Sequence, residues 1–238
     1  MKNSSDKCRL LSNIVLFACL FYFLPAATGI DASLDYEVDG DGFHRTIRYR
    51  VDTGEFFSDN CYLAIHLSPN PTLYVNIDEL ADRQRLGETT ACSEGEIDVE
   101  LFAEKAKRQN VTVCAPLQKS DNVLNLPIHQ RYQLPRWNDE FVKVKLPEPM
   151  LLLGCKERIK EHPVSKIDLC WPCVDLSLKW RRIPYKTKTE PYVWAVPVGN
   201  LADLEHITRI TLFTVIFGTI IILRTLWFSK GDKREKKD

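Results

Sequence analysis

Residues 44–51 read His-Arg-Thr-Ile-Arg-Tyr-Arg-Val, and from the threonine onward polar and apolar side chains alternate. On an extended chain, Ile47, Tyr49 and Val51 lie on one face and the residues between them lie on the other. This period of two is typical of a strand that buries one face and exposes the other, as strands of antiparallel sheets do. The pattern predicts β-structure here.

The same alternation recurs downstream, in Cys61–Leu67, Ile97–Leu101, Val142–Leu146 and Val174–Lys179. Turn signals rich in proline and glycine separate the runs. Residues 78–86 and 104–109 are interpreted as short helices. Together these patterns predict that residues 30–200 form one all-β domain, an antiparallel β-sandwich of about eight to ten strands.

The N-terminal end of the chain has the layout of a secretory signal peptide. Lys2, Lys7 and Arg9 precede an uninterrupted apolar run, Ile14–Leu24, and small residues follow it. We predict that residues 1–29 are a cleaved signal peptide. An uncleaved anchor is the alternative, and it is less favoured because a membrane helix needs about 20 apolar residues.

A second apolar segment, residues 207–228, is long enough to cross a bilayer, since a helix of that length rises about 33 Å. Arg209 and Arg224 lie near its two ends, where arginine side chains can snorkel to the headgroups. A buried helix of a soluble domain is the alternative. Residues 229–238 carry five basic residues, so the positive-inside rule predicts a cytosolic tail and a type I orientation with the β-sandwich in the lumen.

Six cysteines lie between the two apolar segments: Cys61, Cys92, Cys114, Cys155, Cys170 and Cys173. An even number of cysteines in an oxidising compartment predicts disulfides, although the sequence does not choose their pairing. Asn110-Val111-Thr112 is an acceptor sequon, and we expect Asn110 to be glycosylated in a surface loop of the lumen.

Little in the sequence points to catalysis, a cofactor or a nucleic-acid partner. The formal net charge is zero, which gives no sign of nucleic-acid binding. The five histidines show no metal-ligand spacing, and no glycine-rich phosphate loop or Gly-x-Ser-x-Gly elbow is present. Nothing marks acidic pairs such as Asp78-Glu79 as catalytic rather than solvated. We predict no catalytic residue, no metal and no cofactor.

One motif has the form of a redox site, Cys170-Trp171-Pro172-Cys173. Thiol oxidoreductase chemistry needs the first cysteine at a helix N-terminus, where the helix dipole stabilises the thiolate. Residues 174–179 alternate like a strand, so that dipole should be missing. Structural disulfide cysteines are the favoured interpretation.

The last block of interest is Leu126–Pro135, in which two prolines enclose His129, Arg131 and Tyr132. Proline fixes φ, so the block should be a rigid extended segment that presents polar and aromatic groups. Arginine and tyrosine are common at protein interfaces. The alternative is a sheet edge, where prolines prevent strand pairing and the polar residues face water.

This block, from Pro127 to Tyr132, resembles the Pro-x-His-x-Arg-Tyr signature of the PIG-X family. Four further segments agree with that family in the same order: Gly42-Phe43-His44-Arg45, Cys61-Tyr62-Leu63-Ala64-Ile65, Leu73–Leu80 and Val196-Pro197-Val198-Gly199. The resemblance covers most of residues 42–228. Asn76 departs from it, because the family often has Asp there.

The resemblance implies a luminal, non-catalytic subunit of glycosylphosphatidylinositol (GPI) mannosyltransferase I. Proteins of the family stabilise PIG-M, a multispanning subunit, in the membrane of the endoplasmic reticulum (ER). That complex transfers the first mannose from dolichol-phosphate-mannose to the glucosaminyl-phosphatidylinositol precursor. The resemblance also favours a partner-interface or fold-defining role for Pro127, His129, Arg131 and Tyr132.

Some alternatives stay open at this point. A type I adhesion or receptor ectodomain would share the topology, and a luminal thiol oxidoreductase would use Cys170. Within the span, Arg209 or Arg224 could pair with acidic residues of a partner instead of snorkelling, and Gly218 with Thr219 could allow close helix approach.

Overall fold

The computed structural model describes residues 29–119, 121–137, 140–159 and 162–232. All but the last residue of the predicted signal peptide, residues 1–29, lies outside this part of the chain. The end of the predicted tail, residues 233–238, also lies outside it.

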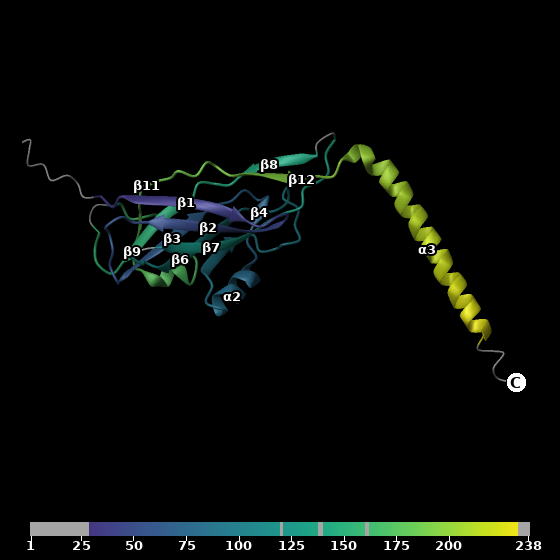
Figure 1. Ribbon diagram of the computed structural model, residues 1–238, viewed down its shortest axis with the longest axis horizontal. Coiled ribbons are helices and arrows are strands. Elements are labelled where there is room, and N and C mark those ends of the chain that lie inside the picture. The colour runs from purple at the N-terminus through teal and green to yellow at the C-terminus, as the bar shows by residue number, and fades with distance from the viewer. Residues whose placement is uncertain (1–28, 120, 138–139, 160–161, 233–238) are drawn as a thin grey trace, which may run out of the picture.

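The chain folds mainly as β-sheets, which confirms the predicted all-β class (Figure 1). The first sheet, sheet A, has five strands. In spatial order they are β11 (Tyr185–Lys186), β1 (Ala32–Asp39), β2 (His44–Asp52), β7 (Asn122–Gln130) and β4 (Leu73–Tyr74). Neighbouring strands run antiparallel, except that β11 runs parallel to β1.

The second sheet, sheet B, is antiparallel and also has five strands. In spatial order they are β10 (Trp180–Arg182), β9 (Met150–Cys155), β3 (Cys61–Leu67), β6 (Gln109–Pro116) and β5 (Thr90–Gly95). A separate two-stranded ribbon pairs β8 (Phe141–Lys145) with β12 (Val193–Pro197).

The main core lies between sheets A and B. Ile47, Tyr49 and Val51 of β2 point into it, as the alternation predicts, and they meet apolar residues of β3 such as Leu63 and Ile65. The ribbon adds Trp194 and Val196 to the same core, with their side chains almost fully buried. Each inward-facing residue removes apolar surface from water, which is the dominant stabilising contribution.

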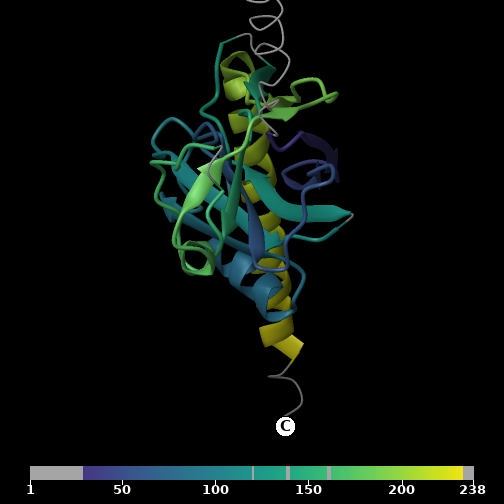
Figure 2. The same cartoon turned by 90° about the vertical axis from the view of Figure 1, so that its left-hand side faces the viewer.

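Sheet B is covered on its outer face as well. Ala64, Leu152 and Trp180 belong to a second buried cluster, which the segment before and within η1 (Cys173–Leu176) closes over. This double cover explains why β3 is buried along almost its whole length, rather than on alternate residues only. Figure 2 shows the sandwich turned so that one end faces the viewer.

The short helix expected at residues 78–86 is present as α2 (Ile77–Arg85). Its first turn is capped by Asn76, whose Oδ1 accepts a hydrogen bond from the Asp78 N–H at 2.9 Å. Aspartate caps a helix in the same way, so Asn76 fits the place where the PIG-X family often has Asp.

Three local predictions are wrong. Residues 97–101, expected as a strand, form a turn, in which Glu96 and Asp98 side chains accept hydrogen bonds from backbone N–H groups two residues on. Residues 104–109, expected as a helix, hold the end of a turn at 103–105 and an irregular stretch that leads to Gln109, where β6 begins. Residues 174–179, expected as a strand, include η1 instead, because disulfides anchor that segment to sheet B.

The chain ends in η2 (Leu201–Asp203) and the long helix α3 (Leu204–Asp232). The stretch Leu201–Ser229 is long and apolar enough to cross a membrane, and none of its most apolar window is buried within the protein. In Figure 1 the helix leaves the sandwich beside the β8–β12 ribbon. An unburied apolar helix of this length is expected to lie in lipid rather than in water.

Candidate functional site

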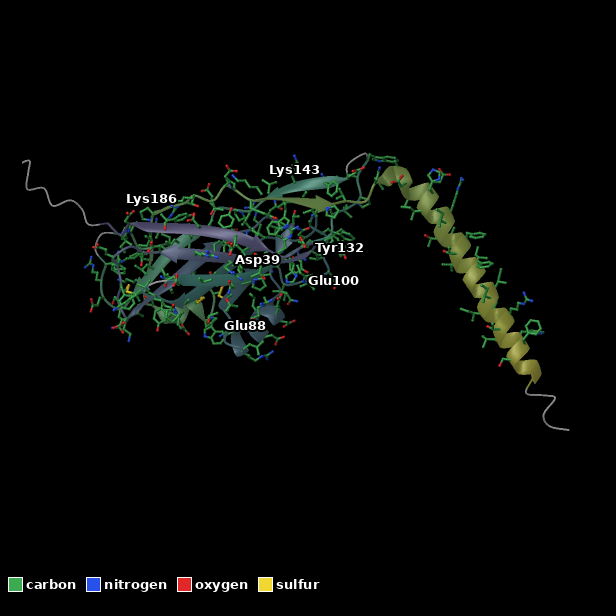
Figure 3. All side chains as sticks on the ribbon, in the orientation of Figure 1. Asp39, Glu88, Glu100, Tyr132, Lys143 and Lys186 are labelled. Atoms are coloured by element: carbon green, nitrogen blue, oxygen red, sulfur yellow. A yellow bond between two sulfur atoms is a disulfide. The ribbon has the colours of Figure 1, made fainter. Side chains whose placement is uncertain are left out.

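Segments that are far apart in the sequence meet at one end of sheet A. His129 of β7 pairs in register with His44 of β2 on one side and with Tyr74 of β4 on the other. We call this group the His129–Arg131 cluster; its members are Phe43, His44, Tyr74, Glu79, His129, Arg131 and Tyr132. In Figure 3 the labelled Tyr132 marks this end of the sandwich, which is the end nearer to α3.

His129 is the centre of the cluster. Its ring stacks on Tyr74 at 5.1 Å between centroids and meets the ring of His44 edge-on at 4.4 Å. Its Nε2 lies 2.6 Å from Oε2 of Glu79, the third residue of α2. The residue is 6% exposed, so Glu79 takes the place of water at Nε2, while Nδ1 is buried with no hydrogen-bond partner among the described residues.

The electrostatics of this pair favour a neutral histidine beside an ionised carboxylate. Burial lowers the pKa of His129, and this outweighs the hydrogen bond and charge of Glu79, which act to raise it. Burial alone would raise the pKa of Glu79, but hydrogen bonds from His129 and Arg83 bring it below its usual value. The geometry therefore fits a tautomer in which the Nε2–H of His129 donates to Glu79.

Arg131 is even more deeply buried, with 2% exposure. Its Nη1 donates hydrogen bonds to the carbonyls of Asp98, at 2.6 Å, and of Leu101. Its guanidinium lies 4.4 Å from the centroid of the Tyr74 ring, in a cation–π contact. Burial lowers the pKa of Arg131 from its usual value. Arg131 thus connects the loop after β5 to sheet A.

Tyr132 is the outward-facing member of the cluster. It is 69% exposed, and its ring lies 5.0 Å from that of Phe43. Hydrogen bonds hold the backbone on both sides, from the Ala103 N–H to the Tyr132 carbonyl and from the Gln130 N–H to the Phe43 carbonyl. The exposed Tyr132 and the half-buried Phe43 therefore lie on a base of buried polar side chains.

The interpretation of residues 126–135 as a sheet edge is wrong. β7 is an interior strand between β2 and β4, and Pro127 lies opposite Thr46 in the register with β2. His129, Gln130 and Arg131 are buried rather than in water. The polar residues of this block face the cluster because β4, α2 and the loop after β5 cover them.

The cluster has the wrong chemistry for a catalytic centre. Its one carboxylate, Glu79, is engaged by His129 and Arg83, and the Arg131 guanidinium is engaged by carbonyl groups. Within the described ranges, the structure brings together no set of three residues suited to a metal ion. The cluster can instead hold the aromatic side chains of Tyr132 and Phe43 in a fixed position.

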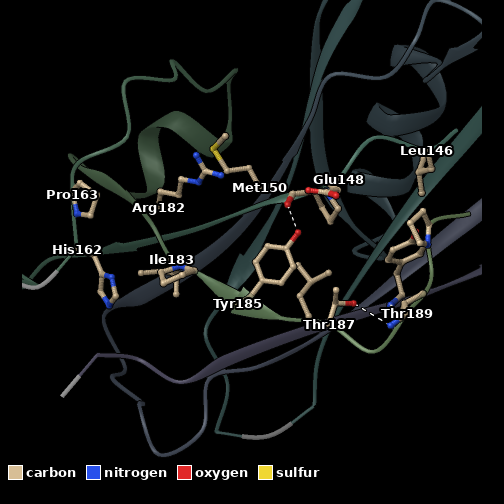
Figure 4. Close-up of a pocket in the computed structure, with 15 residues that line it drawn as sticks. Leu146, Glu148, Met150, His162, Pro163, Arg182, Ile183, Tyr185, Thr187 and Thr189 are labelled. Atoms are coloured by element: carbon tan, nitrogen blue, oxygen red, sulfur yellow. Dashed lines mark hydrogen bonds between the residues drawn. The ribbon is translucent and has the colours of Figure 1, made fainter. Parts of the chain in front are cut away.

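A cavity of about 790 Å³ lies elsewhere and is lined mostly by apolar and proline residues (Figure 4). Tyr185 lies in it and donates a hydrogen bond to the Pro149 carbonyl at 2.6 Å. The cavity borders β11, at the end of the sandwich away from α3. Glu148 is the only carboxylate that the described residues contribute to its lining, so these residues offer no acid and base pair of the kind that hydrolases use.

The six cysteines of the β-sandwich and its covering segment form three disulfides: Cys61–Cys155, Cys92–Cys170 and Cys114–Cys173. Cys170 and Cys173 are therefore disulfide-bonded to two different cysteines and not to each other. The sequence argues against redox chemistry because a strand is expected directly after the Cys170–Cys173 motif. That expectation is wrong, because η1 begins at Cys173 instead. The pairing itself gives Cys170 and Cys173 a structural part, fixing their segment to β5 and β6.

Asn110 is exposed, but it lies on β6 and not in a loop. In α3, Arg209 pairs with Glu205 one turn earlier, and the Arg224 guanidinium lies 5.6 Å from the centroid of the Phe228 ring one turn later. Each arginine thus reaches toward the nearer end of the helix. Beside Gly218 there is open space, with no atom within 4 Å of an added Cβ.

Sequence reasoning missed Glu79, which it treated as one of a solvated acidic pair. Two signals were available: its place in the first turn of a predicted helix and Arg83 four residues later. Neither signal indicates His129, which lies fifty residues away in the sequence. Only the register of β2, β4 and β7 brings the two together.

A comparison with protein families matches residues 40–227 to the family described as PIG-X / PBN1. Among curated proteins, the human "GPI alpha-1,4-mannosyltransferase I, stabilizing subunit" is 28% identical over 80% of this chain and 78% of its own length. The mouse protein of the same name is 31% identical over 83% and 82%, and the rat protein is 29% identical over the same shares.

Proposed function

Because this chain belongs to the PIG-X / PBN1 family, we propose that it is the stabilising subunit of a GPI alpha-1,4-mannosyltransferase I. It is an accessory subunit and not a catalyst. Its partner is a PIG-M-like multispanning subunit, which contains the active site. The names of the human, mouse and rat relatives, each a stabilizing subunit, support this division of labour.

The observation that supports a binding role most directly is the His129–Arg131 cluster. The exposed Tyr132 and the half-buried Phe43 form an aromatic pair beside the buried side chains of His129 and Arg131. Aromatic residues held rigidly lose little conformational entropy on binding, which is why they are common at the centres of interfaces. We propose that this pair contacts a luminal loop of the catalytic subunit.

The proposed topology is type I in the ER membrane. Residues 1–29 are removed as a signal peptide, residues 30–200 form the luminal domain, 207–228 cross the membrane, and 229–238 are cytosolic. The unburied apolar helix α3 and the basic tail support this orientation. Lys236 and Arg234, third and fifth from the end, approximate a dilysine-type retrieval signal. In this topology the exposed Asn110 meets the glycosylation machinery.

The test is affinity purification of the full chain from detergent-solubilised membranes. The variant is the double substitution Phe43→Ala/Tyr132→Ala. Loss of two interface aromatics typically weakens binding by at least about 2 kcal/mol, or more than tenfold, so recovery of the multispanning subunit should fall strongly. Leu178→Ala is the control, because Leu178 is a fully exposed apolar residue that lies on the segment that covers sheet B.

Normal recovery with the aromatic double variant, at normal expression, would show that the pair does not bind the partner. Equal losses with the Leu178 control would point to a general effect of surface substitutions. The proposal requires a loss with the first variant and none with the second.

A further inference from the structure

The chain between β7 and β8 is tied directly to the connector that precedes α3. The Arg136 N–H donates to the Gly199 carbonyl at 2.8 Å, and the Leu201 N–H donates to the Arg136 carbonyl at 2.9 Å. A few residues on, Phe141 pairs with Pro197 in the ribbon. Two points of this chain are thus fixed to the last residues before the helix.

This attachment sets the height of these residues above the membrane. Leu201 precedes the apolar stretch 207–228 by six residues, which is about 9 Å along a helix. The headgroup layer on each side of the hydrocarbon core is roughly 5 to 8 Å thick. A large side chain beside the connector is therefore within reach of that layer.

Two such side chains are present and exposed. Trp137 follows Arg136 directly and is 69% exposed, and Phe141 at the start of β8 is 58% exposed. The inward face of the ribbon is buried through Val144, Trp194 and Val196, so Phe141 lies on its outward face. Two large aromatic side chains beside the start of a span match the aromatic belt that membrane proteins place at the interface.

We propose that Trp137 and Phe141 rest in the headgroup layer of the luminal leaflet and form a second membrane contact of the domain. The occupant of this surface is zwitterionic lipid. The acidic residues of these segments, Glu140, Asp203 and Glu205, are balanced by Arg136, Lys143 and Arg209, so the surface has no net charge that would select an anionic lipid. This inference rests on the proposed span of α3, but not on the identity of the partner subunit.

A second contact has a mechanical consequence. One flexible attachment would leave the sandwich free to tilt on its helix, whereas two attachments restrict that motion. Tyr132 lies only five residues before Trp137. The lipid contact therefore holds Tyr132 and Phe43 of the His129–Arg131 cluster at a fixed distance from the membrane surface. Luminal loops of a membrane protein emerge from the bilayer at that distance.

The test uses the full chain, reconstituted alone into phosphatidylcholine vesicles with bromine near the headgroup end of the acyl chains. Bromine quenches tryptophan fluorescence at short range. Trp227→Phe removes the tryptophan at the other end of the helix, so that quenching in this background reports on the luminal side. We expect clear quenching in Trp227→Phe and its loss in Trp137→Phe/Trp227→Phe.

The matched control is Trp171→Phe/Trp227→Phe. Trp171 is 70% exposed, like Trp137, but it belongs to the segment that covers sheet B. This control should keep the quenching. The proposal is overturned if Trp227→Phe shows no quenching, or if the Trp171 and Trp137 variants lose it equally.

The same series separates this proposal from the span on which it rests. Quenching that is greater in the wild-type chain than in Trp227→Phe shows that α3 lies in lipid. If that difference is seen without quenching of Trp137, the lipid contact is wrong and the span stands. If neither that difference nor quenching of Trp137 is seen, both the lipid contact and the span are wrong. The assignment of the partner subunit is tested separately, by affinity purification.

Discussion

At the scale of the residue, the protein keeps an arginine inside without pairing it to a carboxylate. Arg131 donates to two backbone carbonyls and lies over Tyr74, while Glu96 and Asp98 add only a more distant attraction. Burying a charge is costly unless its donors are matched, and here Nη1 has two carbonyl partners while Nε and Nη2 are buried with no hydrogen-bond partner among the described residues. These contacts hold the Arg131 side chain in one position, and Arg131 directly precedes the exposed Tyr132.

Arg131→Lys should therefore destabilise the luminal domain by about 1 to 3 kcal/mol. Lysine keeps the charge, but its compact ammonium cannot reproduce the planar fork that reaches two carbonyls while stacking on a ring. Arg50→Lys is the control, because the Arg50 side chain is 62% exposed and pairs only with Glu37 at the surface. Thermal unfolding of the purified full chain measures the stability of both variants. Equal melting temperatures for Arg131→Lys and Arg50→Lys would contradict this account of Arg131.

The same cluster should make stability depend on pH. The folded-state pKa of His129 is lowered, so its contribution is present above the usual histidine pKa of 6.5 and is lost as pH falls below that value. Glu79, whose pKa is also lowered, adds a loss at still lower pH, below 4.5.

The measurement is the melting temperature of the wild type and of His129→Gln between pH 7.5 and pH 5.5. The wild type should lose stability over this interval, and the variant should lose less. Burial also lowers the pKa of His66, so some dependence should remain in the variant. An identical pH dependence in the two proteins would show that His129 is not a source of it.

At the scale of the element, the sequence predicts whatever has a clear period. Alternation of polar and apolar residues predicts β2 and β3. The short helix expected at residues 78–86 is present as α2. The pattern fails at residues 97–101 and 174–179, where alternation is present but side-chain hydrogen bonds or disulfides impose another conformation. The site was beyond sequence reasoning in one respect: His129 meets Glu79 and His44 only through the pairing of non-consecutive strands.

The segment that carries η1 is fixed to sheet B by two of the three disulfides, so it should be sensitive to their loss. Cys114→Ala/Cys173→Ala opens a loop of 59 residues and should cost about 2 to 5 kcal/mol of stability. The outer face of sheet B should then become accessible, and limited proteolysis should cut near residues 165–179.

Cys61→Ala/Cys155→Ala is the control for this prediction. That disulfide joins β3 and β9, which are already paired as neighbouring strands, so its removal should leave the segment around η1 protected. Cleavage of that segment at the same rate in both variants would contradict the role assigned to the Cys114–Cys173 bond.

At the scale of the whole molecule, a disulfide-bonded β-sandwich is attached to one long apolar helix. The His129–Arg131 cluster lies at the end of the sandwich nearer to that helix, and the cavity beside β11 lies away from it. Arg209 and Arg224 reach toward opposite ends of the helix, which leaves its middle apolar. This layout suits a subunit that supports a membrane enzyme from the luminal side.

The central claim is that this chain stabilises a catalytic subunit. Its most direct test is the half-life of the multispanning GPI mannosyltransferase subunit, followed after protein synthesis is stopped, in cells with and without this chain. We predict that the half-life falls severalfold without the chain, and that the wild-type chain restores it but Phe43→Ala/Tyr132→Ala does not. An unchanged half-life in cells that lack the chain would contradict the account.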